Sequence, residues 1–352
     1  MSGGLDSSVA AALLKRTGFD VAGAFMKLID SPRFRGVEKR ARKVAKILKI
    51  PFYVFNFEKE FKKRIVDYFL AGNKKGITPN PCVLCNKEIK FGLLLEKALA
   101  LDADYIATGH YATKYEVKSQ NSKVKSYKLL GAKDKNRDQS YFLWKLNQKQ
   151  LKRVLLPIGD YSEKGVRNLA KKFGLSFLLN VPKSMEICFI PKTVEDFLKL
   201  YLKPKRGGLV DIKGSVLGEH QGLPFYTIGQ RKGIRLPGGP YYVLDKNLKK
   251  NILIVTKNEK DLYKKELIAK NISWIFGKEP KLPFKAMVKI RYRHNPALAM
   301  ITKNLKSTIY NLKFARPQRA ITPGQSAVFY SPAGALVKAG KSNELLGGGI
   351  IY

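Results

Sequence analysis

Three cysteines are the side chains of this sequence best suited to nucleophilic or metal chemistry. Cys82 and Cys85 form a C-x-x-C pair within Thr78–Lys87, and Cys188 follows more than one hundred residues later. Two prolines keep the chain extended before the pair, so we expect Asn86 or Cys85 to open a helix, where a thiol has a lowered pKa. Cys188, taken alone, is expected to be a buried structural cysteine. Three cysteines in 352 residues are too few for a disulfide scaffold, which indicates a reduced, cytoplasmic chain.

Two kinds of metal site remain open for these cysteines. A zinc site would need a fourth ligand, and the histidines available are His110, His220 and His294. Alternatively, Cys82, Cys85 and Cys188 could hold an iron–sulfur cluster that leaves one iron open.

A glycine turn at the start of the sequence is suited to binding phosphate. The string Ser2-Gly3-Gly4-Leu5-Asp6-Ser7-Ser8 precedes a stretch rich in alanine and leucine, which predicts a helix over 8–15 capped by Asp6 or Ser7. Backbone N–H groups at a helix N-terminus attract anions. The spacing is neither that of a Walker loop nor that of G-x-G-x-x-G.

The elements around these residues predict a doubly wound parallel α/β sheet. Strand-like segments at 21–29, 51–57 and 105–108 alternate with helical patterns such as Val37, Ala41, Val44 and Leu48. Ligands bind at the carboxyl ends of the strands of such sheets, where Met26, Gly109 and His110 fall. A hairpin is expected over 113–117 and 125–130. The segment 136–144 mixes charged and aromatic residues, which fits either a helix start with core residues or an RNA contact.

The second half of the chain predicts β structure. A linker is expected near 204–208, followed by a small central β-rich domain. Short alternating strands at 286–290, 297–301 and 327–329 predict a β-barrel at the end. The expected domains are therefore 1–203, 204–265 and 266–352.

Composition points to a folded protein with a polyanionic partner. There are 67 Lys and Arg against 27 Asp and Glu, a net charge of +40, and hydrophobic residues make up 45%, too many for a disordered chain. Such a charge favours nucleic acid, although a lysine-rich compositional bias would give the same number. No apolar run is long enough for a membrane helix.

The motifs together resemble those of the bacterial tRNA-specific 2-thiouridylases, a family of PP-loop ATP pyrophosphatases. The opening string matches the family's PP-loop, and the three cysteines stand in matching contexts. Further matching segments follow in order at 25–27, 78–91, 107–112, 138–143, 187–190, 218–222, 229–233, 291–293, 322–327 and 347–349.

The resemblance implies an adenine nucleotide alpha hydrolase-like fold and ATP-dependent 2-thiolation of the wobble uridine in tRNA. O2 of the uridine would be adenylated, releasing pyrophosphate, and sulfur would come from a persulfide on Cys188, releasing AMP. Cys85 would be the partner nucleophile, and a Cys85–Cys188 disulfide would form. ATP, with Mg²⁺, would bind at Ser2, Gly3, Gly4, Leu5, Asp6, Ser7, Met26 and Gly109. The tRNA would contact Asn80, Pro81, Cys82, His110, Arg137, Asp138, Gln139, Arg291, Tyr292 and Gln325.

The resemblance also implies partners. The substrates would be tRNAs accepting Lys, Glu and Gln, and a sulfur-relay protein or a cysteine desulfurase would supply the persulfide to a monomeric enzyme. Some members carry Asp at the position of Cys82, where it is proposed as an acid or base, and this sequence has a thiol there instead.

One departure from the family concerns the first strand. In the family a buried strand leads into the PP-loop, whereas this sequence begins at the loop, so we expect an upstream start or a sheet without its central strand. Two other functions remain: a tRNA-binding protein without catalysis, and a PP-loop ligase or amidotransferase acting on a small metabolite.

Overall fold

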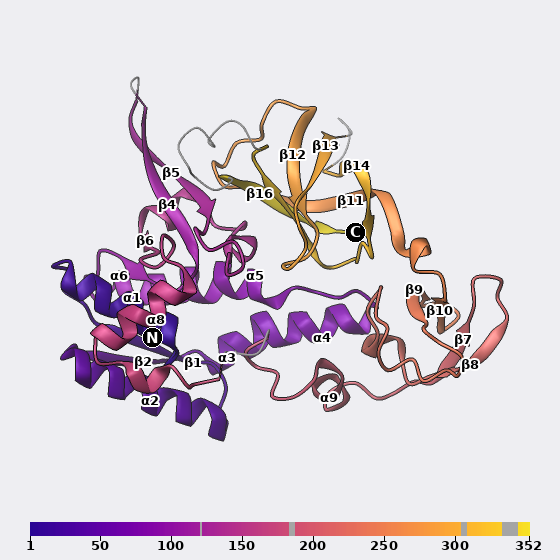
Figure 1. Ribbon diagram of the computed structural model, residues 1–352, viewed down its shortest axis with the longest axis horizontal. Coiled ribbons are helices and arrows are strands. Elements are labelled where there is room, and N and C mark those ends of the chain that lie inside the picture. Colours follow the sequence, from indigo (N-terminus) through magenta and orange to yellow (C-terminus); the bar gives the residue numbers. More distant parts are fainter. Residues whose placement is uncertain (120–121, 183–186, 304–307, 333–343) are drawn as a thin grey trace.

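The computed structural model describes residues 1–119, 122–182, 187–303, 308–332 and 344–352 (Figure 1). The chain forms an α/β part, a small mixed sheet and a barrel, in that order. Among these residues, no helix combines the length and the apolar character needed to cross a membrane.

The strands of the α/β part pair in parallel, as predicted. β1 (Gly23–Lys27) pairs with β2 (Phe52–Asn56), and β3 (Ile106–Ala107) pairs with β6 (Val154–Leu155). The two pairs are separate sheets, and no strand within the described ranges joins them.

Helices flank these pairs where the apolar periodicity predicted them. In α2, for example, Ala41 and Val44 are fully buried. The helix that was expected to open at Cys85 or Asn86 is π-helical over Asn86–Leu93. The helices of this part are α1 (Leu5–Arg16), α2 (Pro32–Leu48), α3 (Glu58–Phe61), η1 (Lys62–Val66), α4 (Asp67–Lys74), α5 (Pro81–Cys85), η2 (Asn86–Leu93), α6 (Leu94–Leu99), η3 (Ser140–Phe142), α7 (Gln148–Lys152), α8 (Glu163–Lys172), η4 (Ser176–Leu178) and α9 (Val194–Lys199).

The small central β-rich unit is a four-stranded mixed sheet. Its strands are β7 (Gly207–Val210), β8 (Val216–His220), β9 (Tyr242–Asn247) and β10 (Ile252–Thr256), in the order β8-β7-β10-β9. The short helices η5 (Leu223–Phe225) and η6 (Glu259–Leu262) accompany it. Leu209, Val243 and Leu253 are fully buried and join a core that extends to α3 and α4.

A closed barrel follows, as the alternating segments predicted. Its strands are β11 (Tyr263–Trp274), β12 (Phe284–Lys289), β13 (Ala297–Lys303), β14 (Tyr310–Arg319), β15 (Ser326–Tyr330) and β16 (Glu344–Ile351). They run in the order β11-β14-β13-β12-β15-β16, and pairing of β11 with β16 closes the ring. Ala286, Val288 and Ile290 face its core.

A hairpin ties the α/β part to the barrel. β4 (Ala112–Ser119) and β5 (Ser122–Gly131) form the predicted hairpin, and β5 pairs with β16 through Leu129 and Leu130. The hairpin therefore extends the sheet of the barrel, beside which it stands in Figure 1.

The segment 136–144 supplies core residues to this junction. Tyr141, Leu143 and Trp144 are fully buried, which agrees with the core interpretation of these aromatic residues. The Tyr141 hydroxyl donates to Ser326 O at 3.0 Å, and Trp144 Nε1 donates to Ser326 Oγ at 3.1 Å.

Candidate active site

One cavity of about 1800 Å³ collects most of the residues that the sequence singled out. Its loop region is lined by Ser2, Gly4, Leu5, Asp6, Ser7, Gly109 and Arg137, and its thiol region by Cys82, Cys85 and Cys188. Met26, Asn80, Pro81, His110, Gln139, Arg291, Tyr292 and Gln325 also line it. The loop and the thiols therefore open onto the same space.

The loop region begins with a helix N-terminus that no side chain caps. α1 starts at Leu5 and its N-cap is Gly4, so the prediction that Asp6 or Ser7 caps the helix is wrong. Ser7 Oγ instead donates to Gly4 O at 3.2 Å and accepts from Ser2 N at 3.1 Å, which closes the turn. The first N–H groups of a helix have no intrahelical acceptor, so they suit an anion.

Gly109 lies against the backbone of this loop. A Cβ at Gly109 would lie 2.5 Å from Ser7 N and 2.6 Å from Asp6 C, distances that no side chain tolerates. Gly3 has a φ of +61° and approaches Val37 O of α2 equally closely. Two glycines therefore allow the loop to pack between the end of β3 and α2.

Four charged or polar side chains meet beside the loop. Arg137 Nη2 donates to Asp6 Oδ2 at 3.2 Å, and the Tyr111 hydroxyl donates to Asp6 Oδ1 at 3.1 Å. Arg137 Nε lies 3.7 Å from Glu163 Oε2, and the guanidinium stacks on the Tyr111 ring at 5.0 Å. Sequence reasoning assigned no role to Tyr111 or Glu163, since nothing in their local sequence indicates a contact with the loop.

The three thiols differ in exposure. Cys85 is buried, Cys82 is intermediate and Cys188 is exposed, so the prediction of a buried Cys188 is wrong. Its neighbours Phe189 and Ile190 take the buried positions instead. The Cys188 and Cys82 thiols are close enough to Cys85 for their charges to influence its pKa.

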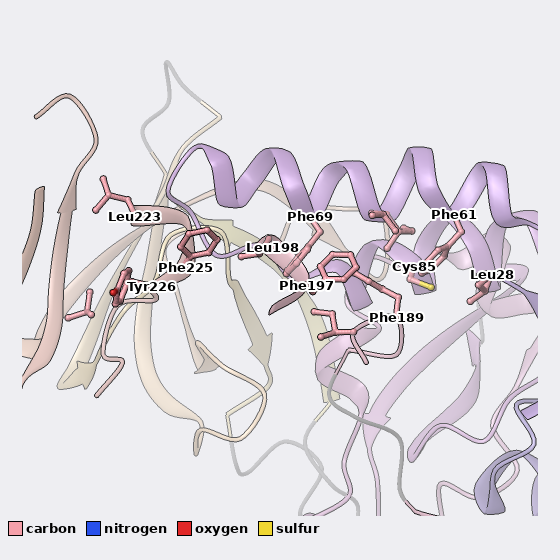
Figure 2. Packing of buried hydrophobic residues seen from close by; sticks show 14 of the residues in the cluster. Leu28, Phe61, Phe69, Cys85, Phe189, Phe197, Leu198, Leu223, Phe225 and Tyr226 are labelled. Atoms are coloured by element: carbon pink, nitrogen blue, oxygen red, sulfur yellow. The ribbon is translucent and has the colours of Figure 1, made fainter. Parts of the chain in front are cut away.

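An aromatic cluster holds the segment that carries Cys188. Phe189 packs edge-on against Phe61 at 5.7 Å, Phe69 at 5.6 Å and Phe197 at 5.2 Å. Figure 2 shows Cys85 next to Phe61 in the same cluster. This packing positions two segments distant in sequence beside each other.

Burial governs the chemistry of Cys85. It raises the pKa of the Cys85 thiol to about 12, and the ammonium of Lys90 opposes this shift. The predicted lowering of the pKa is therefore wrong. The helix begins at Pro81, so Cys85 ends α5 and continues into η2, too far inside to benefit from a helix N-terminus.

His110 is a buried, neutral side chain of this cavity. Burial and the charge of Lys90 lower its pKa well below the usual value. Its Nδ1 lies 2.8 Å from Thr108 Oγ1. Lys87, which the sequence also placed near the thiols, donates to Gln150 Oε1 at 2.9 Å.

Asp138 and Gln139, predicted to contact tRNA, bond to the protein itself. Asp138 Oδ1 accepts from Ala132 N at 3.2 Å and from Ser140 N at 3.0 Å, and Asp138 Oδ2 lies 3.7 Å from Lys289 Nζ of β12. Gln139 Oε1 accepts from the backbone N–H of Tyr111 at 2.9 Å. These contacts fix the segment that follows Arg137.

Residues of the barrel complete the cavity wall. Gln325 Nε2 donates to Thr78 O at 2.8 Å, three residues before Pro81 begins α5. Arg291 Nη2 donates at 2.8 Å to Ile228 O, in the segment between β8 and β9, and at 3.0 Å to Ala320 O, just after β14, which links the central unit to the barrel. The ring of Tyr292 lies tilted at 43° against that of Phe142, with the ring centroids 4.6 Å apart. The side chains of Gln325, Arg291 and Tyr292 thus connect separate segments of the chain at the edge of the cavity.

The side chains of the cavity fit an Mg²⁺ ion bound with a nucleotide, but not a zinc ion or an iron–sulfur cluster. Across the described residues, no group of three His, Cys, Asp or Glu is arranged to hold a metal ion, so the cysteines as placed do not fit a cluster or a zinc site. Asp6 in the loop fits an Mg²⁺ that arrives with a nucleotide, since such Mg²⁺ takes one or two carboxylates and phosphate oxygens.

Family models match three successive segments of the chain. Residues 1–192 match the tRNA methyl transferase HUP domain, 195–257 the tRNA methyl transferase PRC-barrel domain, and 264–351 the Aminomethyltransferase beta-barrel domain. The order agrees with that of the α/β part, the central sheet and the barrel.

Curated relatives are similar over nearly the full chain. The tRNA-specific 2-thiouridylase MnmA of Carboxydothermus hydrogenoformans is 41% identical, covering 100% of this chain and 96% of the relative. The protein of the same name from Clostridioides difficile is 43% identical (100% and 96%), and MnmA 1 of Geobacillus kaustophilus is 44% identical (94% and 90%).

Proposed function

Since the chain belongs to the family of tRNA-specific 2-thiouridylases, we propose that it replaces the C2 oxygen of the wobble uridine in tRNA by sulfur. The observation that carries this proposal is the cavity that Cys85 and Cys188 share with the loop Ser2–Ser7. Two of the matching family models are described as tRNA methyl transferase domains. The paired thiols support sulfur transfer instead, because a methyl group can be transferred without passing between two cysteines.

Activation of the uridine is the first proposed step. C2 is a poor electrophile and its oxygen is a poor leaving group. O2 attacks the α-phosphorus of ATP, the new O–P bond forms and pyrophosphate leaves. The uncapped N–H groups at the start of α1 stabilise the phosphate charge. Mg²⁺, when bound with ATP, neutralises part of that charge.

Sulfur transfer is the second proposed step. A persulfide on Cys188 attacks C2, a C–S bond forms, and the oxygen leaves with AMP. Cys85 then attacks the inner sulfur, giving up its proton to solvent, so that a Cys85–Cys188 disulfide forms and the uridine keeps the outer sulfur. A thiol reductant must restore the cysteines, and a persulfide-bearing donor protein must reload the exposed Cys188.

The basic surface of the chain supplies the affinity for tRNA. A net charge of +40 attracts the phosphates of a tRNA stem. The wobble base must leave its stack, which costs a few kcal/mol and is least costly in a loop. Asn80, Cys82, His110, Tyr292 and Gln325 line the cavity that would receive the base.

Complementation tests this proposal. A strain that lacks its own 2-thiouridylase would express the wild type, Cys188→Ser, Cys85→Ser or Cys82→Ser, and 2-thiouridine in hydrolysed tRNA would be measured by mass spectrometry. We expect Cys188→Ser and Cys85→Ser to abolish 2-thiouridine, and Cys82→Ser to retain it. Persistence of the modified base in Cys188→Ser would refute the proposed sulfur path.

Pyrophosphate release separates the other two functions. We expect release from ATP only when tRNA is present. Tight tRNA binding without any release would indicate a non-catalytic tRNA-binding protein. Release that needs no tRNA and survives thiol blocking would indicate a ligase or amidotransferase of a small metabolite.

A further inference from the structure

Lys90 is a charged side chain between two fully buried neighbours. Ile89 and Phe91 have no exposed surface, whereas Lys90 is partly exposed and lines the cavity. All three lie in η2, a π-helical stretch in which hydrogen bonds join each residue to the fifth residue on. Such stretches are rare and frequent at functional sites. A cation that one of them directs into a cavity is a candidate for a ligand contact.

The two lysines of η2 differ in their partners. Lys87 Nζ donates to Gln150 Oε1 at 2.9 Å, and Gln150 Nε2 donates to the carbonyl oxygens of Lys87 and Phe91. The Lys90 ammonium makes no hydrogen bond or ion pair within the described part of the chain. An ammonium carries three N–H donors, so those of Lys90 are available to a ligand in the cavity.

Lys90 lies where the loop region and the thiol region of the cavity meet. Its charge acts to lower the pKa of both the Cys85 thiol and the His110 ring, so the ammonium is close to both. The ring of Phe91, the next residue of η2, has its centroid 5.8 Å from that of His110. Gly109, the residue before His110, packs against the backbone of the loop. The ammonium therefore stands between the loop and the thiols.

The proposed reaction places negative charge at this boundary. When the C2–O2 bond of the adenylated uridine breaks, its electron pair goes to the oxygen that leaves on the α-phosphate of AMP. That oxygen faces the carbon attacked by the Cys188 sulfur, whereas the pyrophosphate lies away from the thiols. A fixed cation aimed at the place where charge develops stabilises the transition state. A cation between the loop and the thiols therefore meets the α-phosphate.

We propose that Lys90 binds the α-phosphate of the nucleotide and stabilises the charge on AMP as it leaves the uridine. This inference rests on the proposed function, because it takes ATP as the nucleotide and uridine C2 as the carbon that loses its oxygen. The competing partner for the ammonium is the Cys85 thiol. Burial raises the pKa of that thiol to about 12, so it is uncharged and forms no ion pair with Lys90.

Binding measurements without catalysis test the proposal. Wild type, Lys90→Met and Lys90→Arg would be titrated with fluorescent N-methylanthraniloyl ATP and with the same derivative of AMP. Adenosine would be measured by displacement of the fluorescent ATP, and unmodified tRNA by filter binding. The matched control is Lys87→Met, which removes the lysine of η2 that is bonded to Gln150. Thermal unfolding would show that each variant is folded, and Lys90→Gln replaces Lys90→Met should that variant fail to fold.

The expected loss follows the α-phosphate. Lys90→Met should weaken the binding of ATP and of AMP by about tenfold each, and Lys90→Arg by less. Adenosine and tRNA should bind as before, and Lys87→Met should bind every ligand as the wild type does.

Three results would overturn the inference and leave the proposed function intact. A loss for ATP with AMP unchanged would place Lys90 on the outer phosphates, and a loss confined to tRNA would place it on the nucleic acid. Unchanged nucleotide binding with slower alkylation of Cys85 by iodoacetamide would place it on the thiol. Absence of ATP binding by the wild type would overturn both the inference and the proposed function.

Discussion

The loop region and the thiol region of the cavity are built in opposite ways. In the loop region charges are paired across elements, as in Asp6, Arg137 and Glu163, and the backbone N–H groups are uncapped. In the thiol region an apolar aromatic cluster surrounds Cys85 and carries Cys188 on its edge. Phosphate chemistry needs fixed charges, whereas a buried thiol is protected from oxidants until its partner sulfur arrives.

The largest effect that tests this comparison concerns Phe189. Phe189→Ala removes the ring that packs against Phe61, Phe69 and Phe197. We expect a loss of about 3–5 kcal/mol in the free energy of unfolding, measured by urea denaturation. ATP binding by the folded fraction should stay unchanged. Leu200→Ala, at a side chain 75% exposed, is the control. A loss as small as that of the control would show that the cluster does not hold the Cys188 segment.

The next effect tests the loop region. Gly109→Ala puts a Cβ 2.5 Å from Ser7 N, so the loop must move. We expect a loss of about 1–3 kcal/mol in stability and, with it, loss of binding of the fluorescent ATP. Gly36→Ala in α2, where the nearest atom is 4.0 Å away, should preserve both. Normal ATP binding in Gly109→Ala would contradict the described packing of the loop.

The pH dependence of alkylation tests the thiol region. At pH 7.5 iodoacetamide should modify the exposed Cys188 at least about tenfold faster than the buried Cys85. The pKa of Cys85 is raised to about 12, so its thiolate fraction, and its rate, should rise about tenfold per pH unit from pH 7 to 9 without a plateau. Mass spectrometry of tryptic peptides measures both rates, and a plateau below pH 9 would contradict the raised pKa.

The smallest effect tests whether the ion pair between Asp138 and Lys289 affects ligand binding or only the stability of the fold. Lys289→Met removes a partly buried cation 3.7 Å from Asp138 Oδ2, and we expect a loss of about 1 kcal/mol in stability. ATP and tRNA binding should be unchanged. Lys285→Met, on an exposed position of the same strand, is the control. A change in ATP binding would show that Lys289, on a barrel strand, also influences the loop region of the cavity.

Local patterns predicted the elements well because they depend on neighbouring residues. The spacing of Val37, Ala41, Val44 and Leu48 predicted α2. The alternation of Ala286, Val288 and Ile290 predicted the barrel strand β12 and the side chains, in it and just after it, that face the barrel core. The order of strands and helices also gave parallel pairing. The start of α1 was misplaced, because Asp6 and Ser7 suit a cap by residue type, but the turn places Gly4 there.

The site was harder to predict because burial and side-chain pairing depend on distant segments. Whether Cys85 or Cys188 is buried depends on Phe61, Phe69 and Phe197, which no local pattern links to either cysteine. The pairing of Arg137 with Asp6 joins residues that lie far apart in sequence. A motif can therefore identify the chemistry of a residue without indicating which side chain it faces.

The continuation of the barrel sheet into the hairpin β4–β5 limits how the molecule can move. Swinging the barrel away from the α/β part would break the β5–β16 ladder together with the buried bonds of Tyr141 and Trp144 to Ser326. The ladder and these two hydrogen bonds therefore oppose a hinge motion between the barrel and the α/β part. A nucleic acid bound as proposed would therefore meet the barrel and the α/β part together, in the one arrangement that this ladder favours.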